Sequence, residues 1–210
     1  YTKYKSFEQK VSVHTALTLP KGYTLLISLP TGAGKSMVTQ MLAFYGEGLT
    51  LAVVRTTALG FDQFRATKSI LKGSLDESCI ACYCGITSKD EELRVINDLR
   101  ANKLKLLITS PEAIVKNNRL KTALLESAKQ HYLSNLVIDE AHIVQDWGML
   151  FRPDFQILSI IRKQLLESSG NRIRTILLSA TLSEDTVQVL KKLMSDEVHW
   201  VELRCDSLRK

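Results

Sequence analysis

Apolar runs of strand length alternate with helical patterns along the whole chain. Most of these runs are continuously hydrophobic, which is typical of strands that are buried on both faces of a sheet. The alternation predicts an α/β fold with a mostly parallel central sheet and helices on both faces. The predicted strands are Thr24–Leu29, Leu49–Val54, Cys79–Cys84, Lys105–Thr109, Asn135–Ile138, Thr175–Leu178 and His199–Leu203. The predicted helices are Ser36–Tyr45, Ala58–Leu71, Ser88–Ala101, Leu120–Gln130, Phe155–Glu167 and Glu184–Met194, with caps at Ser88 and Ser183.

The composition is that of a globular protein with a sizeable core. The chain has 210 residues, of which 45% are hydrophobic and 24% are charged, and this length predicts one domain. No apolar run approaches the roughly 18 residues of a membrane-spanning helix, and the first residues lack a signal-peptide pattern. We therefore expect no membrane partner. The net charge of +6 permits a nucleic-acid partner without requiring one.

Three of the four cysteines lie close together in a predicted strand. These are Cys79, Cys82 and Cys84, whereas Cys205 is near the end of the chain. A metal site would usually offer two separated pairs of cysteines or added histidines, and no histidine is near these three. Free cysteine is among the residue types most often buried. We therefore predict reduced structural thiols, as in an intracellular protein, rather than a metal site.

A glycine-rich loop with the sequence LPTGAGKS follows the first predicted strand, at the carboxyl end where ligands of open parallel sheets bind. Its glycines let the backbone curl so that N–H groups point at phosphate oxygens, and the next helix presents its positive N-terminus to the same anion. The strict pattern has glycine where Leu29 stands, but the position between strand and helix disfavours a turn without chemical function. Lys35 is predicted to reach the β- and γ-phosphates, and Ser36 to bind Mg²⁺. The predicted phosphate-binding residues are Thr31, Gly32, Ala33, Gly34, Lys35 and Ser36.

Two carboxylates, Asp139 and Glu140, end the buried strand that begins near Asn135. An aspartate in this position can hold Mg²⁺ through an oxygen ligand, usually by way of water. The adjacent Glu140 can accept a proton from an attacking water molecule. The alternative is a pair of solvated acids at the start of a helix, which the preceding apolar strand and the upstream phosphate-type loop disfavour.

Hydroxyl side chains stand at three further strand ends. Thr56 follows the second predicted strand, Thr109 ends the fourth and Ser110 follows it, and Ser179 and Thr181 follow the sixth. Such hydroxyls can bind the phosphates of a nucleic acid or can cap the following helix, and the sequence leaves both possibilities open. For Ser179 and Thr181 we also consider a position that couples the acidic pair to a polymer site.

The loop after the acidic pair contains Trp147, Phe151 and Arg152, residue types that stack on unpaired bases and contact phosphates. The order of LPTGAGKS, TTALGFDQ, TSPE, DEAH and SAT resembles the first RecA-like domain of a superfamily 2 helicase, a P-loop NTPase, and covers essentially the whole chain. Within that superfamily, DEAHIVQDWGMLFRPDF is similar to the RecQ family, in which the DEAH box precedes an aromatic-rich loop ending in W-G…F-R-P. The sequences of several motifs are also similar to those of the RecQ-like helicases of bacterial DNA-modification and phage-defence systems, of the DpdF type.

Four residues depart from the pattern of the resembled family. Asp146, Met149 and Leu150 stand where RecQ-type loops usually carry Gln, His and Asp, and Arg55 stands where proline is common. These departures favour a divergent RecQ-like branch.

The resemblance implies a motor that is driven by ATP with Mg²⁺ and moves on single-stranded or partly duplex DNA. It implies that His142 relays the state of the γ-phosphate toward Ser179 and Thr181, and that Gln9 reads the adenine edge. A glutamine on a solvated helix face is the alternative for Gln9. The nucleic-acid contacts that it implies are those of Thr56, Thr109, Ser110, Trp147, Phe151 and Arg152. The alternative functions are an RNA helicase, a double-strand translocase and a nucleotide-gated DNA-binding scaffold.

The resemblance also implies a particular domain organisation. Residues 1–203 are expected to form the helicase ATP-binding RecA-like domain 1, and residues 204–210 to begin a linker to a second RecA-like domain. In this class an arginine from the second domain stabilises charge in the transition state, so we expect the 210-residue chain alone to be nearly inactive. The absence of an initiating Met also suggests a piece of a longer protein. A cytoplasmic or nucleoid-associated, bacterial location is expected.

Overall fold

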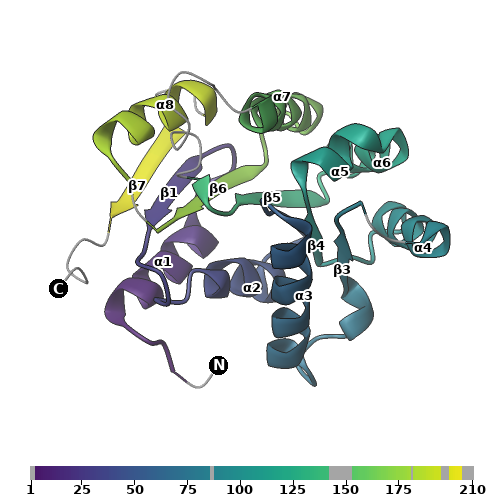
Figure 1. Ribbon diagram of the computed structural model, residues 1–210, viewed down its shortest axis with the longest axis horizontal. Coiled ribbons are helices and arrows are strands. Elements are labelled where there is room, and N and C mark those ends of the chain that lie inside the picture. The colour runs from purple at the N-terminus through teal and green to yellow at the C-terminus, as the bar shows by residue number, and fades with distance from the viewer. Residues whose placement is uncertain (1–2, 86–87, 142–152, 181, 195–198, 205–210) are drawn as a thin grey trace.

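Seven parallel strands form one central sheet, in the order β3-β4-β2-β5-β6-β1-β7 (Figure 1). The computed structural model describes residues 3–85, 88–141, 153–180, 182–194 and 199–204. The strands are β1 Thr24–Ser28, β2 Leu49–Val53, β3 Ile80–Tyr83, β4 Leu106–Thr109, β5 Leu133–Ile138, β6 Arg174–Ser179 and β7 Trp200–Arg204. The predicted α/β class and parallel sheet are confirmed, and all seven predicted strands are present.

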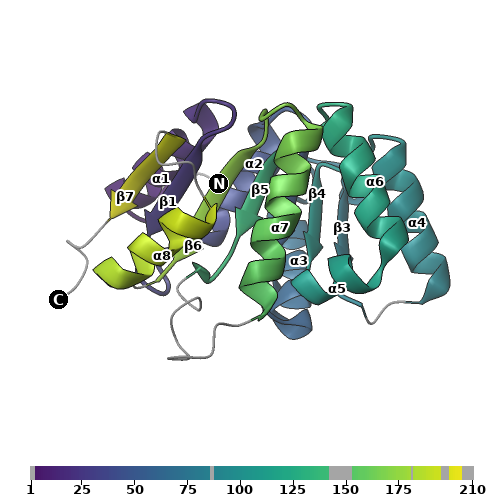
Figure 2. The same ribbon diagram turned by 90° about the horizontal axis from the view of Figure 1, so that it is seen from above.

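Helices cover both faces of the sheet, as Figures 1 and 2 show. One face is covered by α1 Phe7–Thr18, α2 Ser36–Tyr45 and α3 Thr57–Leu71. The other is covered by α4 Lys89–Arg100, α5 Pro111–Lys116, α6 Asn118–Lys129, α7 Pro153–Ser168 and α8 Glu184–Met194. A short 3-10 helix, η1 Glu77–Cys79, precedes β3. None of the helices in the described ranges has the length and apolarity needed to cross a membrane.

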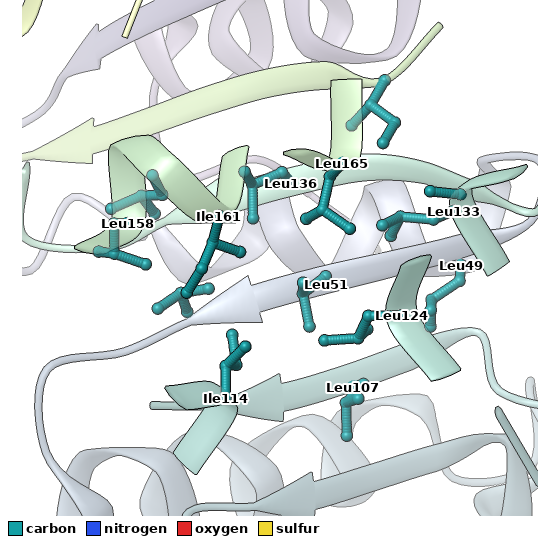
Figure 3. Packing of buried hydrophobic residues seen from close by; sticks show 14 of the residues in the cluster. Leu49, Leu51, Leu107, Ile114, Leu124, Leu133, Leu136, Leu158, Ile161 and Leu165 are labelled. Carbon is teal, nitrogen blue, oxygen red and sulfur yellow. The ribbon is translucent and has the colours of Figure 1, made fainter. Parts of the chain in front are cut away.

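Alternate residues of each central strand enter two separate cores, which explains why the strands are continuously hydrophobic. In β1, Leu26 packs under the α4–α8 layer, whereas Leu25 and Ile27 pack under the α1–α3 layer. Figure 3 shows the first of these cores, in which Leu51 and Leu136 of neighbouring strands lie among side chains of the covering helices. Both faces of the central strands are therefore mostly apolar, and the charged residues of the sequence motifs lie beyond the strand ends.

Helix α1 is the main element that the sequence pattern did not predict. Its buried residues are Gln9, Ser12, Val13 and Ala16, which have helical spacing, but two of the four are polar. A polar residue in the buried stripe hides the hydrophobic periodicity on which helix prediction depends. The alternative for Gln9, a solvated helix face, was wrong because its side chain is only 2% exposed.

The predicted burial of the clustered cysteines is only partly correct. Cys82 and Cys84 are buried with their sulfur atoms 3.7 Å apart, but Cys79 belongs to η1 and is half-buried. The hydrogen bond with Cys84, together with burial, raises the pKa of the Cys82 thiol, so it stays protonated at neutral pH. Cys205 lies outside the described residues.

Two predicted helix caps are confirmed. The Ser88 hydroxyl accepts a hydrogen bond from the Glu91 N–H at 3.3 Å, and the Ser183 hydroxyl accepts one from the Thr186 N–H at 3.2 Å. The Glu91 side chain pairs with Arg94. These caps fix where α4 and α8 begin.

The glycine-rich turn between β1 and α2 contains Gly32 and Gly34 with φ angles of 80° and 87°, in the left-handed region that favours glycine. Helix α1 packs beside this turn, and the Gln9 Nε2 atom donates a hydrogen bond to the Gly34 carbonyl at 3.2 Å. The Gln9 Oε1 atom accepts one from the Lys5 N–H at 2.6 Å. A Cβ atom on Gly34 would lie 2.1 Å from Gln9 Nε2, whereas a Cβ atom on Gly32 would meet nothing within 4 Å.

We expect Gly34→Ala to lower the free energy of unfolding more than Gly32→Ala does. Both substitutions force alanine into a left-handed backbone at a cost of about 1–2 kcal/mol, but only the first clashes with Gln9. Denaturant unfolding of the two variants measures the difference. In the double variant Gln9→Ala/Gly34→Ala the clash is removed, so its loss should be smaller than the sum of the single losses. Equal losses for Gly32→Ala and Gly34→Ala would contradict the predicted clash.

Candidate functional site

The parallel sheet brings the motif-bearing loops to one edge, because every strand presents its carboxyl end there. The glycine-rich loop follows β1, the acidic pair follows β5, and Ser179 ends β6, which lies between these two strands. Thr56 and Ser110 follow β2 and β4 on the other side of β5. The strand order therefore determines which motifs become neighbours.

Lys35 joins the glycine-rich loop to the acidic pair. Its Nζ atom lies 3.9 Å from Glu140 Oε1 and donates a hydrogen bond to the Leu29 carbonyl at 3.5 Å. The Lys35 side chain is only 11% exposed, so its charge is held near the acidic residue. Leu29, which replaces the glycine of the strict pattern, is fully buried, and its N–H donates to the Ser179 carbonyl at 3.0 Å. It extends the hydrophobic core beneath the loop.

The Asp139 carboxylate is held by hydrogen bonds at both oxygens. Oδ1 accepts from the Glu140 N–H at 2.9 Å, and Oδ2 accepts from Gln63 Nε2 at 2.6 Å. The Asp139 N–H donates to the Val53 carbonyl at 3.0 Å, so the backbone is also fixed. These contacts orient the carboxylate before any ligand binds.

Glu140 has a left-handed backbone, with a φ angle of 55°. For a residue other than glycine this costs roughly 1–2 kcal/mol, and such strained residues cluster at functional sites. The turn ends β5 and places the Glu140 side chain beside Lys35. The strain is an independent sign that this position serves a function.

The side chains around the glycine-rich loop fit a magnesium nucleotide. Lys35 offers a cation, the exposed Ser36 a hydroxyl, and Asp139 and Glu140 carboxylate oxygens, which are the ligand types that Mg²⁺ and phosphates require. The space around Gly32 is open, so a phosphate can approach its backbone. Gln9 is buried against the same loop, where its amide binds the Gly34 carbonyl and the Lys5 N–H.

A groove of about 720 Å³ opens at the carboxyl ends of β2, β3 and β4. Three exposed cations line it, namely Arg55, Lys116 and Arg119, together with the carboxylates Glu92 and Glu112. Asn117 holds one wall, because its Nδ2 atom donates to the Tyr83 hydroxyl at 2.8 Å. The sequence did not single out Lys116 and Arg119, because Lys116 ends α5, Arg119 lies in the first turn of α6, and only the fold places them near Arg55.

Thr56 and Ser110 line this groove and also cap helices. The Thr56 hydroxyl accepts from the Leu59 N–H at 3.3 Å, and the Ser110 hydroxyl accepts from the Ala113 N–H at 3.2 Å. Capping uses each hydroxyl as an acceptor, so each O–H can still donate to a phosphate. At Thr56 and Ser110, helix capping and phosphate binding, the two roles that the sequence left open, can therefore occur together.

Thr109 is placed differently from the prediction. It is fully buried, and its hydroxyl donates to the Tyr83 carbonyl at 2.7 Å. Its position at the end of β4 turns the side chain toward β3 instead of the groove. The structure therefore gives it a supporting role at the strand end and offers no basis for contact with a polymer.

The coupling role of Ser179 stays a prediction, because the loop with Trp147 lies outside the described residues. The Ser179 side chain is fully buried in β6, between the acidic strand β5 and the phosphate-loop strand β1, whereas the groove lies on the other side of β5. Ser179 is therefore a neighbour of both nucleotide motifs and does not lie between the acidic pair and this groove. The predicted site residues that lie outside the described residues are His142, Trp147, Phe151, Arg152 and Thr181.

Comparison with known proteins identifies the family of the chain. The profile of the DEAD/DEAH box helicase family matches residues 8–190. The ATP-dependent DNA helicase RecQ of Synechocystis sp. is 35% identical over 148 residues, which is 69% of this chain and 28% of that protein. The ATP-dependent DNA helicase Q-like 4B of Arabidopsis thaliana is 31% identical over 171 residues, which is 80% of this chain and 14% of that protein.

A solved structure confirms the RecA-like helicase fold. The crystal structure of a hypothetical ATP-dependent RNA helicase from Sulfolobus tokodaii superposes with a TM-score of 0.68, covering 98% of this chain and 54% of that one. At 19% identity this likeness shows the fold alone. The chain spans less than a third of the length of the two curated relatives. The resemblance to RecQ-like helicases is confirmed as sequence similarity, and the chain belongs to the DEAD/DEAH box helicase family.

Proposed function

We propose that this chain is the ATP-binding motor domain of an ATP-dependent DNA helicase or translocase, and that it binds Mg²⁺-ATP and single-stranded DNA. The observation that carries the proposal is the 3.9 Å approach of Lys35 to Glu140, which unites the phosphate-type loop with the acidic strand end. The RecQ names of similar proteins support DNA as the polymer. A scaffold that only binds nucleotide has no chemical need for Lys35, Asp139 and Glu140 together.

At the nucleotide site, each group has a distinct role. Mg²⁺-ATP supplies the reacting phosphoryl group and the divalent charge when it is bound. Lys35 neutralises phosphate charge, while Ser36 and Asp139 hold the metal through oxygen atoms. Glu140 accepts the proton of the attacking water, and its pairing with Lys35 keeps the carboxylate at the reacting end of the nucleotide. Gln9, whose Nε2 atom binds the Gly34 carbonyl of the loop, is also proposed to read the adenine edge.

We infer that the groove holds the sugar-phosphate backbone of single-stranded DNA. Arg55, Lys116 and Arg119 supply charge, and the hydroxyls of Thr56 and Ser110 supply directed hydrogen bonds. Such contacts carry no base information, as a motor that moves along DNA requires. Trp147, Phe151 and Arg152 remain proposed as the residues that stack on bases and contact phosphate. A coupling role for His142, Ser179 and Thr181 is likewise proposed.

We further propose that residues 1–203 act with a second RecA-like domain in the same protein. Phosphoryl transfer in this class needs an arginine finger, which is worth about 10³ to 10⁵ in rate. The greater length of the curated relatives supports the presence of further domains. Turnover is then a property of the assembled motor, located in the cytoplasm or at the nucleoid.

We expect Glu140→Gln in the full-length protein to retain ATP binding and to reduce hydrolysis by at least about 100-fold, because glutamine cannot take up a proton. Binding of a fluorescent nucleotide and release of phosphate measure the two effects. Glu167→Gln, a change at an exposed glutamate of α7 that pairs with Lys163 away from both sites, is the matched control and should keep turnover. Hydrolysis at the unsubstituted rate in Glu140→Gln would remove Glu140 as the base.

We expect the triple variant Arg55→Ala/Lys116→Ala/Arg119→Ala to weaken single-stranded DNA binding. When the logarithm of the DNA association constant is plotted against the logarithm of salt concentration, the slope should become less steep. Its magnitude should decrease by about 0.7 for each DNA phosphate that the variant leaves without a cation. The control variant Lys103→Ala/Lys129→Ala/Arg172→Ala removes the same charge next to the amino ends of β4, β5 and β6. Equal salt slopes for the two triple variants would contradict the groove. Parallel titrations with RNA and with duplex DNA test the alternative polymers.

We expect the 210-residue chain alone to hydrolyse ATP at least about 1,000-fold more slowly than the DNA-bound full-length protein, because it lacks the arginine of a second domain. Phosphate release by both proteins at equal nucleotide saturation tests this. Full DNA-stimulated turnover by the isolated chain would refute the need for a second domain.

A further inference from the structure

Gln63 is the residue of α3 that contacts the acidic strand end. Its Nε2 atom donates a hydrogen bond of 2.6 Å to Asp139 Oδ2, across 76 positions of sequence. We propose that Gln63 is a positioning residue for Mg²⁺ binding by Asp139, and that through α3 it makes metal affinity depend on occupancy of the groove. This inference rests on the proposed function, because it assigns Asp139 to the metal.

The hydrogen bond completes the fixation of the Asp139 carboxylate. An ionised carboxylate only accepts hydrogen bonds, so the Gln63 amide must present its N–H and not its carbonyl. With Oδ1 held by the Glu140 N–H at 2.9 Å, the carboxylate plane cannot rotate without losing a bond. The remaining lone pairs then face a ligand in a set direction. Groups that orient metal ligands in this way typically change metal affinity by about 10- to 100-fold.

Helix α3 is tied to three functional elements. Its N-cap is Thr56, which lines the groove, and Gln63 lies two turns further along the helix. Thr67, one turn beyond, accepts a buried hydrogen bond from Gln40 of α2 at 3.3 Å, and α2 begins directly after the phosphate-type loop. Single-stranded DNA bound in the groove therefore contacts the N-terminus of α3, the helix whose Gln63 holds Asp139.

Close packing makes α3 able to transmit a displacement. Gly60 packs so tightly on β3 that an added Cβ atom would lie 2.6 Å from the Cys84 sulfur. Thr57 Oγ1 donates to the Cys84 carbonyl at 3.3 Å, which ties the first turn of α3 to the groove wall. Among the described residues, Gln63 thus provides a direct link from the groove side of β5 to Asp139, whereas Ser179 lies on the opposite side.

The test substitutes Gln63→Met in the full-length protein, because methionine keeps the length of the side chain and removes the donor. Mn²⁺ binding is followed by electron paramagnetic resonance in the presence of a non-hydrolysable ATP analogue, with and without saturating single-stranded DNA. We expect Mn²⁺ affinity to fall by about tenfold. We also expect DNA to change Mn²⁺ affinity at least about fivefold in the unsubstituted protein, and that change to be lost in the variant.

Two controls separate positioning from a general loss of structure. Asp62→Asn alters the neighbouring residue, which is 74% exposed and pairs with Arg65, and it should leave Mn²⁺ affinity unchanged. Gln63→Leu, a second variant without a donor, should reproduce Gln63→Met, and thermal unfolding of each variant verifies the fold. Unchanged Mn²⁺ affinity in a folded Gln63→Met or Gln63→Leu variant would overturn the positioning role.

The failures of the two proposals are distinguishable. If the unsubstituted protein binds neither the nucleotide analogue nor Mn²⁺, the proposed function fails. If it binds both and the Gln63 variants bind Mn²⁺ equally well, only the role of Gln63 fails. If the variants lose Mn²⁺ affinity but keep the DNA effect, Gln63 positions Asp139 and the route through α3 is wrong.

Discussion

Burial of the sheet on both faces is the constraint on which the rest of this structure depends. Because alternate residues of each central strand enter different cores, most strand side chains are apolar, and buried polar ones such as Asn135 and Thr50 bond to each other. Parallel strands also require a crossover after each strand, so the loops that carry polar residues gather at one edge. The same requirement that excludes water from the sheet thus concentrates charge at the carboxyl ends.

At that edge, neighbouring strands decide which charges interact. Lys35 and Glu140 approach to 3.9 Å although β6 lies between the strands β1 and β5 that they follow. The Asp139 carboxylate accepts a hydrogen bond at each oxygen, and the Glu140 backbone is held in the left-handed region. Together these features make the arrangement rigid. Rigid acids suit catalysis, since their orientation need not be established again at each turnover.

Helix α3 contacts both the groove and the acidic strand end, because Thr56 at its N-terminus lines the groove and Gln63 binds Asp139. Strand β5 separates the groove loops from the phosphate-type loop, so a signal between polymer and nucleotide must pass Asp139 or go around it. Within the part of the chain that the structure describes, the hydrogen bond from Gln63 to Asp139 is a short connection between α3 and the acidic strand end. Under the proposed function, this contact links DNA binding to metal binding.

The sequence by itself determined the strand and helix alternation, the phosphate-type loop and the acidic strand end, because these signals are local in the chain. It did not reveal α1, since the polar residues Gln9 and Ser12 occupy its buried stripe. Only the tertiary structure decided that Gln9 binds Gly34, that Gln63 binds Asp139, and that Lys116 and Arg119 join Arg55 in a groove. These contacts depend on the order β3-β4-β2-β5-β6-β1-β7, which local periodicity does not encode, because it arises from how two cores pack on one sheet.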